Sequence, residues 1–369
     1  MTLSFQKLFY ILTFLIGLIA AMMLAEAVLI PVSMALLISF ILFPIVKKLE
    51  SWGVNKSLSA AIVLILLFAV IVGGITLFSA QIMNLSDQLY NLSGKLLSAF
   101  TDLVVFFNDQ VNFIDDLNRD ELLEKGKQWL DDSSGSLAKS VFNNTSSFLT
   151  GLVSAIIFTF LFLIYRVGLT KAIVAFGDDA NKSKIFRMLK NIQSVGMKYL
   201  SGMFVMIIIL GFANSIGLWI IGIDSPFLFG FLAAVLAIVP YVGTLIGAIL
   251  PIVYAFVTSD ALWVPLAVIA LFWVIQMVES NFLSPKIVGS NLNVNPLVAI
   301  LSLLIGASVW GVAGMILFLP FAAILKVVCE EFEQLKPVAM LISSDVGDKE
   351  KESTAIKWVE KIKRKYKER

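Results

Sequence analysis

The feature that most constrains this chain is a pair of long tracts without a charged residue, one between Asp224 and Asp260 and the other between Lys286 and Lys326. As straight α-helices, with ~1.5 Å rise per residue, tracts of this length would run roughly 50–60 Å. The hydrocarbon core of a bilayer is only about 30 Å thick, and tilting cannot absorb so large a mismatch. The sequence therefore predicts that each tract bends sharply or folds back near its middle.

Proline and glycine supply residues for such interruptions, and we take them as candidates for the helix breaks and the substrate path. They are Pro240, Gly243, Gly247 and Pro251 in the first tract, and Pro285, Gly289, Pro296, Gly306, Gly311, Gly314 and Pro320 in and around the second. We expect Pro240 to break a helix and Gly247 to allow close packing.

We expect non-helical backbone over residues 240–243 and 281–289, where free peptide groups can bind a polar solute or ion. Two topologies stay open for the tracts. In the first, both tracts cross the membrane as bent helices, which gives eight spans in all. In the second, both tracts are re-entrant hairpins, and only residues 261–280 cross between them.

Composition places the chain among all-α polytopic membrane proteins. Hydrophobic residues make up 59% of the sequence and charged residues only 15%, whereas a soluble domain is nearer half apolar and a quarter charged. The absence of histidine excludes His-based proton relays, zinc-protease motifs and catalytic triads. The single cysteine, Cys329, excludes a disulfide within the chain. We expect no cofactor and no bound metal.

The hydropathy pattern divides the chain into five parts. Residues 1–79 hold three spans, 80–145 form an amphipathic and acidic helical insert outside the cytoplasm, and 146–198 hold a fourth span and a basic loop. Residues 199–328 form the core transport region with the broken segments 225–259 and 287–325, and 329–369 form a charged tail. The insert is expected either to contact another subunit or to pack on itself or along the bilayer.

Lysine and arginine set the predicted orientation, because cytoplasmic loops carry an excess of them. The loop around Lys47–Lys56, the segment Arg166–Lys198 and the end of the tail are all basic. We therefore predict a multi-pass protein of a bacterial cytoplasmic (inner) membrane with both termini in the cytoplasm.

Five polar residues are the candidates for transport or ion coupling. They are Glu279, Asn281, Gln276, Lys286 and Asn214. Glu279 ends an apolar helix, and desolvation there would favour its protonated form, which suits a proton carrier. The alternative is an interfacial carboxylate or an ion pair with Lys286. For Asn214 we favour an interhelical hydrogen bond over a contact with substrate.

Motifs in the second half of the chain resemble those of a known family. The sequence from Glu279 through Pro285-Lys286-Ile287-Val288-Gly289, then Pro296, Gly311-Val312-Ala313-Gly314 and Pro320, is similar to the C-terminal signature of the AI-2E transporter family, named for autoinducer-2 export. Pro240, Gly243, Gly247 and Pro251 resemble its upstream motif. The resemblance implies export of a signalling molecule or antiport of sodium or lithium against protons. It also implies a homo-oligomer, in particular a pentamer.

Together these features predict a secondary transporter, not an enzyme, that exports a small polar solute with ion or proton coupling. A Na⁺(Li⁺)/H⁺ antiporter is the alternative within that class. A non-transporting oligomeric scaffold or a passive pore is the alternative of another class. No Walker A pattern and no GxSxG elbow occur, so neither ATP drive nor acyl-transfer chemistry is expected. The expected partners are the solute, H⁺ or Na⁺, the lipid bilayer and further copies of the chain, and no nucleic acid.

Overall fold

The computed structural model describes residues 5–78, 124–125, 150–179, 181–239, 242–259, 261–284, 286–287 and 293–344. The predicted insert at 80–145 lies outside the described residues apart from 124–125, and so does the tail beyond residue 344. Three of the predicted break residues, Pro240, Pro285 and Gly289, also lie outside them.

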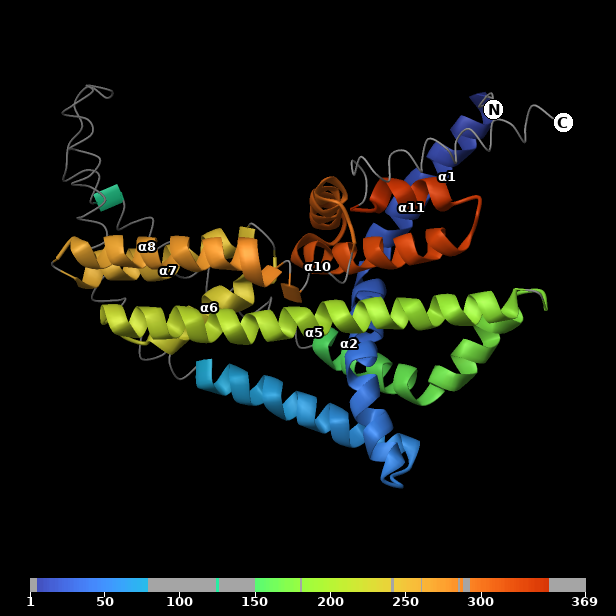
Figure 1. The fold of residues 1–369 in the computed structure, drawn as a ribbon, viewed down its shortest axis with the longest axis horizontal. Coiled ribbons are helices and arrows are strands. Elements are labelled where there is room, and N and C mark those ends of the chain that lie inside the picture. The colour runs from blue at the N-terminus through green and yellow to red at the C-terminus, as the bar shows by residue number, and fades with distance from the viewer. Residues whose placement is uncertain are drawn as a thin grey trace. The chain divides into compact units, whose positions relative to one another are not determined.

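Throughout its described part the chain is helical, which confirms the predicted all-α class (Figure 1). The labelled helices are α1 (Phe5–Leu24), α2 (Glu26–Ser51), α5 (Lys182–Ile221), α6 (Pro226–Leu236), α7 (Val242–Thr258), α8 (Trp263–Val278), a π-helix η1 (Glu279–Leu283), α10 (Pro296–Glu331) and α11 (Lys336–Ile342). Two further helices cover Lys56–Phe78 and Thr150–Ala175. The β-pairing seen in the described residues is an isolated bridge between Val294 and Ser343.

Among the described residues, 6 helical stretches are long and apolar enough to cross a membrane by length and composition. Two shorter apolar helices, Pro226–Leu236 and Gly243–Thr258, fall within the first uncharged tract. The molecule is thus a polytopic membrane protein, as predicted. The 40-residue helix α5 runs without interruption across residue 198, the predicted end of the basic loop.

The chain forms two compact units. The first comprises Met1–Leu64, Ser154–Phe204 and Leu283–Arg369, and the second Ile65–Val153 and Val205–Phe282. Each uncharged tract belongs largely to one unit, the first tract to the second unit and the second tract to the first unit.

In the second unit, the first uncharged tract folds back on itself as the helical pair α6 and α7. Residues 237–239 form the described part of the turn between them. At the turn, a Cβ on Gly243 would overlap the carbonyl of Leu236. At the far end, the rings of Phe229 and Tyr254 lie 5.0 Å apart. The end of α6 thus contacts the start of α7, and the start of α6 contacts the end of α7, so the two helices are antiparallel.

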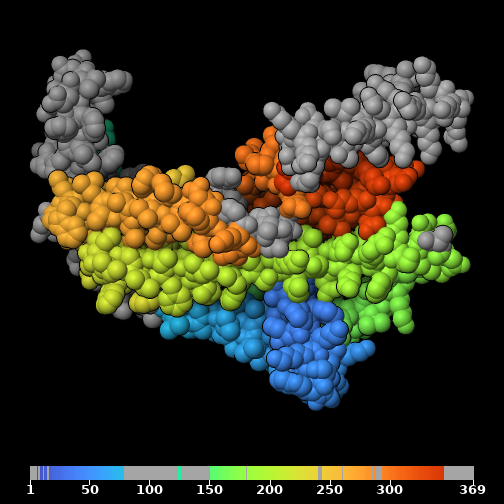
Figure 2. Space-filling view, viewed as in Figure 1, coloured from blue at the N-terminus to red at the C-terminus, as the bar shows by residue number. Residues whose placement is uncertain are grey.

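Packing in this unit extends from the hairpin to α8 and to the C-terminal part of α5, which lie along one another in Figure 2. Leu218 of α5, Tyr254 of α7 and Val268 of α8 are buried in one apolar cluster. Tyr254 also donates a hydrogen bond to Asp224, at the start of the tract, over 3.4 Å. The hairpin is therefore held at its open end by both apolar and polar contacts.

In the first unit, the second uncharged tract is interrupted within α10. Trp310 and Gly311 leave helical geometry, and Gly311 has φ 58° and ψ −135°, a region that only glycine occupies readily. A Cβ on Gly306 would overlap the carbonyl of Gly314, and a Cβ on Gly314 that of Gly306. Eight residues of straight helix would separate these glycines by about 12 Å. The chain therefore reverses at Gly311, and Figure 1 shows the change of direction within α10.

The reversal in α10 is fixed to the N-terminal helices of the same unit. Trp310 donates a hydrogen bond from Nε1 to the carbonyl of Met22 in α1 over 2.9 Å. Its ring packs edge-on against Phe318 at 5.4 Å between centroids. Leu37 of α2 is buried in the same cluster. The turn is thus a packed element of the core.

Hydroxyl groups in the apolar helices are bonded to their own backbone. The Oγ atoms of Ser215 and Ser302 donate to the carbonyls four residues earlier over 2.6 and 2.7 Å. Thr159 does the same toward Ala155 over 2.7 Å. For Ser215 and Ser302 these bonds satisfy the buried hydroxyl without a partner helix, whereas the Thr159 hydroxyl also lies 3.4 Å from the carbonyl of Ala35 in α2.

Candidate functional site

The polar end of α8 is the first predicted site. Glu279 is half-buried at the start of the π-helix, and Gln276 lies beside its carboxylate. Ser280 donates a hydrogen bond to the carbonyl of Gln276 over 2.8 Å, and the Asn281 side-chain amide donates to that of Met277 over 2.8 Å. Because these side chains bond to the last turn of their own helix, they stabilise the altered backbone geometry there.

This arrangement corrects the expectation of non-helical backbone from Asn281 onward. Residues 279–283 form a π-helix, and residues 284, 286 and 287 are helical as well. A π-helix widens the turn so that each N–H reaches the carbonyl five residues earlier, and such turns occur frequently at functional sites. Lys286 is exposed in this segment. The sequence identified the polar segment but not its helical form.

Asn214 is the second predicted residue with a distinctive environment. It is 4% exposed, and its Oδ1 is the one buried side-chain N or O atom of the described residues that has no hydrogen-bond partner. Helical spacing places Gly211, Asn214 and Leu218 on one face of α5. Gly211 packs against Phe231 of α6, and Leu218 belongs to the hairpin cluster. The unpartnered oxygen therefore lies on the face of α5 that packs on the α6–α7 hairpin.

The favoured expectation for Asn214, an interhelical hydrogen bond, is not met at Oδ1. A buried acceptor without a donor is costly, on the order of 1–3 kcal/mol, and each case in a native structure requires an explanation. An amide oxygen in this position can accept a hydrogen bond from a ligand. It can also coordinate a hard cation such as Na⁺ or Ca²⁺, which prefers oxygen ligands.

The glycine and proline candidates fall into two groups: glycines at close contacts or at the reversal, and prolines within or at the start of helices. Gly243 and Gly247 are buried against α6, and Gly311 and Gly314 make the reversal in α10. Pro251 and Pro320 lie buried inside helices α7 and α10, and Pro296 is the first residue of α10, following the N-cap Asn295. Of the predicted non-helical residues 240–243, the last two are helical and begin α7.

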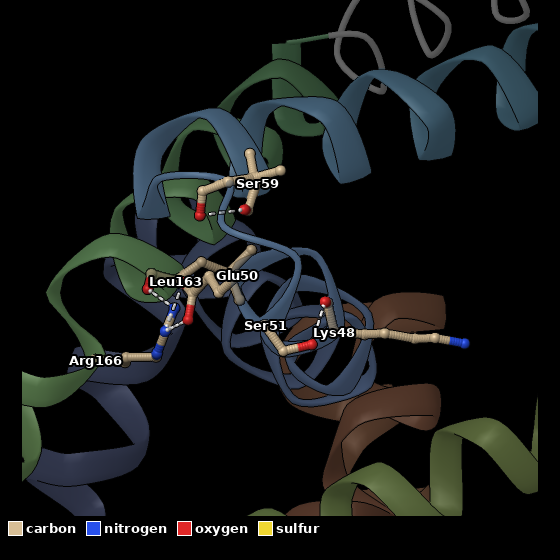
Figure 3. Close-up of polar contacts among 7 residues, drawn as sticks. Lys48, Glu50, Ser51, Ser59, Leu163 and Arg166 are labelled. Carbon is tan, nitrogen blue, oxygen red and sulfur yellow. Dashed lines mark hydrogen bonds and ion pairs between the residues drawn. The ribbon is translucent and has the colours of Figure 1, made fainter.

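A partly buried ion pair that the sequence did not reveal joins α2 to the helix Thr150–Ala175. Nη2 of Arg166 lies 2.7 and 2.5 Å from the two carboxylate oxygens of Glu50, and both side chains are 19% exposed (Figure 3). Nη1 of Arg166 donates to the carbonyl of Leu163 over 2.8 Å. The guanidinium also lies 5.3 Å from the centroid of the Phe43 ring. The two residues are 116 positions apart, so no local pattern could pair them.

Among the described residues, no group of three or more His, Cys, Asp or Glu side chains could hold a metal ion. Cys329 is buried at 2% exposure.

Apolar helices of spanning length and two apolar tracts that fold back on themselves define a multi-pass membrane protein. Comparison with known families specifies the class, because residues 12–334 match the AI-2E family transporters. The chain belongs to this family, and the resemblance of its C-terminal motifs is confirmed.

Several curated proteins are similar to the chain. YrrI of Bacillus subtilis (strain 168) is 24% identical over 316 residues, which cover 84% of this chain and 88% of that protein. YueF of the same organism is 32% identical over 140 residues, 38% of this chain and 37% of that protein. The AI-2 transport protein TqsA of Escherichia coli (strain K12) is 33% identical over 117 residues, 32% of this chain and 34% of that protein.

Proposed function

We propose that the protein is a secondary transporter that exports a small polar solute of the autoinducer-2 type across a bacterial cytoplasmic membrane, coupled to an ion or proton. The observation that carries this proposal is the reversal of both uncharged tracts. Each reversal interrupts an apolar tract and places helix ends within it, and paired broken segments of this kind form the binding sites of secondary transporters. The name of TqsA, an AI-2 transport protein, supports this class of solute.

In this proposal the polar residues of the second unit bind the passenger. Asn214 offers an unpartnered oxygen, and Glu279 offers a half-buried carboxylate. Gln276 and Asn281 hold the π-helical end of α8 in which Glu279 lies. Proton binding at Glu279 couples transport to the proton gradient.

A Na⁺(Li⁺)/H⁺ antiporter is the second candidate function, and the Asn214 oxygen favours it. A buried amide oxygen and a carboxylate are both ligands that a hard cation prefers. Exchange of a cation for a proton at Glu279 would then replace solute export.

Flux into proteoliposomes that contain the purified full chain tests both functions. We expect saturable uptake of autoinducer-2 that depends on an imposed proton gradient. Glu279→Gln should abolish the dependence on the gradient and leave expression intact. Glu26→Gln, which removes an exposed acid of α2, is the matched control and should transport as the unaltered protein does.

Other outcomes replace the proposal. Acidification of the proteoliposome lumen that depends on Na⁺ or Li⁺, without flux of autoinducer-2, establishes the antiporter. Flux that never saturates indicates a passive pore, and no flux of either kind indicates a scaffold. Equal gradient dependence in Glu279→Gln removes this carboxylate from the mechanism.

We further propose that both tracts are re-entrant hairpins and that the termini are cytoplasmic. This topology places position 260 outside the cytoplasm and position 286 inside it, whereas bent spans place them the other way. In a Cys329→Ser background, an impermeant maleimide added to intact cells should label Asp260→Cys and spare Lys286→Cys. The reverse pattern supports bent spans.

We also propose that the protein is a homo-oligomer. Chemical crosslinking of the purified protein can measure the number of subunits.

A further inference from the structure

A cavity of the first unit, outside the transport residues, carries a separate inference. It has a volume of about 550 Å³ and lies between the C-terminal end of α2 and the N-terminal half of α5. Next to it the two helices touch, because a Cβ on Gly196 would stand 2.6 Å from the ring of Phe40. The cavity therefore begins where α2 and α5 are in contact and extends toward the end of α2.

The lining of this cavity is apolar at one end and basic at the other. Phe43 and Met197 line it nearer the contact between the helices, and Lys47, Lys48 and Lys190 line it farther along α2 and α5. From the contact at Phe40 and Gly196, α2 runs on toward Lys47 and α5 leads back toward Lys190, so the lysines of both helices lie farther from the contact than Phe43 and Met197 do. None of the described residues that line the cavity is acidic.

Within the described part of the chain, the positive charge at the basic end is not neutralised by an ion pair. Among the described ion pairs, none involves Lys47, Lys48 or Lys190. The Lys48 ammonium lies 5.7 Å from the ring centroid of Trp52, which is a cation–π contact. Glu50, the carboxylate closest in sequence, is held by Arg166. Three ammonium groups therefore face a cavity to which the described residues bring no counter-charge.

We propose that this cavity binds one anionic glycerophospholipid, with the phosphate at the three lysines and an acyl chain toward Phe43 and Met197. The helix α2 is apolar enough to cross a bilayer and carries Lys47 and Lys48 in its last turns, at the depth where phosphates lie. Lysine clusters at the cytoplasmic ends of spans attract anionic lipids. A free phosphate ion would leave the apolar end of the cavity unfilled, so a lipid matches the whole lining.

The test measures retention of phosphatidylglycerol and phosphatidylcholine by the purified full chain in detergent, using native mass spectrometry. We expect the triple variant Lys47→Gln/Lys48→Gln/Lys190→Gln to lose at least tenfold in affinity for phosphatidylglycerol with no change for phosphatidylcholine. The matched control has the same change of net charge outside the cavity: Lys56→Gln/Lys171→Gln/Lys198→Gln. It should keep the affinity of the unaltered protein.

A second variant separates the site from general charge and from misfolding. Ser194 lines the middle of the cavity, and Ser194→Trp should fill the space and reduce phosphatidylglycerol binding while all lysines remain. Equal losses in both triple variants, or equal binding of the two lipids by the unaltered protein, overturn the proposal. Complete displacement of the lipid by inorganic phosphate at millimolar concentration also overturns it, since the occupant would then be the free anion.

Discussion

Neutralising Glu50 should destabilise the first unit, because it leaves the partly buried guanidinium of Arg166 without its counter-charge. The carboxylate accepts two hydrogen bonds from Arg166 at 2.7 and 2.5 Å, and both side chains are 19% exposed. Removing one partner of a fully buried ion pair costs about 3–5 kcal/mol. Partial exposure screens part of that loss, so we expect on the order of 2–3 kcal/mol for Glu50→Gln.

The magnitude is checked by denaturation of the purified protein in mixed micelles with increasing SDS. Asp179→Asn is the matched control, because Asp179 is 95% exposed and pairs with the half-exposed Lys182. Its removal should change stability by no more than about 0.5 kcal/mol. The double variant Glu50→Leu/Arg166→Met removes both charges and should be more stable than Glu50→Gln alone. The reasoning is refuted if Glu50→Gln matches the control, or if the double variant is the least stable of the three.

Three further substitutions test the second tract. Gly314→Ala should cost about 1–3 kcal/mol in the same assay, since its Cβ would overlap a carbonyl across the reversal, whereas Gly17→Ala, with open space around it, should not destabilise. Trp310→Phe removes a hydrogen bond to α1 and should cost about 1 kcal/mol while the helical circular dichroism stays unchanged. Asn295→Ala removes the cap that accepts from the N–H of Val298 over 2.9 Å and should cost about 1 kcal/mol; no loss would mean that water replaces the cap.

The interruption of the two tracts was predictable from their length alone, since the bilayer sets a limit that any apolar sequence must obey. The position of the second break was not. Pro296 begins α10 and Pro320 lies inside it, while the reversal falls at Gly311, whose positive φ depends on how the two halves pack. Several glycines in the tract offer the same conformational freedom, and sequence does not distinguish them.

The candidate site was predictable in composition but not in contacts. A polar segment after an apolar helix indicated Glu279, but whether Asn281 bonds to its own helix depends on the π-helical turn. Whether the Asn214 oxygen finds a hydrogen-bond donor depends on which side chains of α6 and α7 pack around it. The pairing of Glu50 with Arg166 required the tertiary fold, because each residue taken alone is an ordinary charge that follows an apolar stretch.

The back-bonded hydroxyl of Ser215 in α5 of the second unit bears on the chemistry of any polar route along that helix. Once its proton is committed to a backbone carbonyl, a hydroxyl presents only lone pairs to its surroundings. The amide oxygen of Asn214 has the same polarity. A pathway lined by such groups would be rich in electron pairs and poor in available protons, and it would select for cations or for solutes that bring their own O–H groups, and against anions.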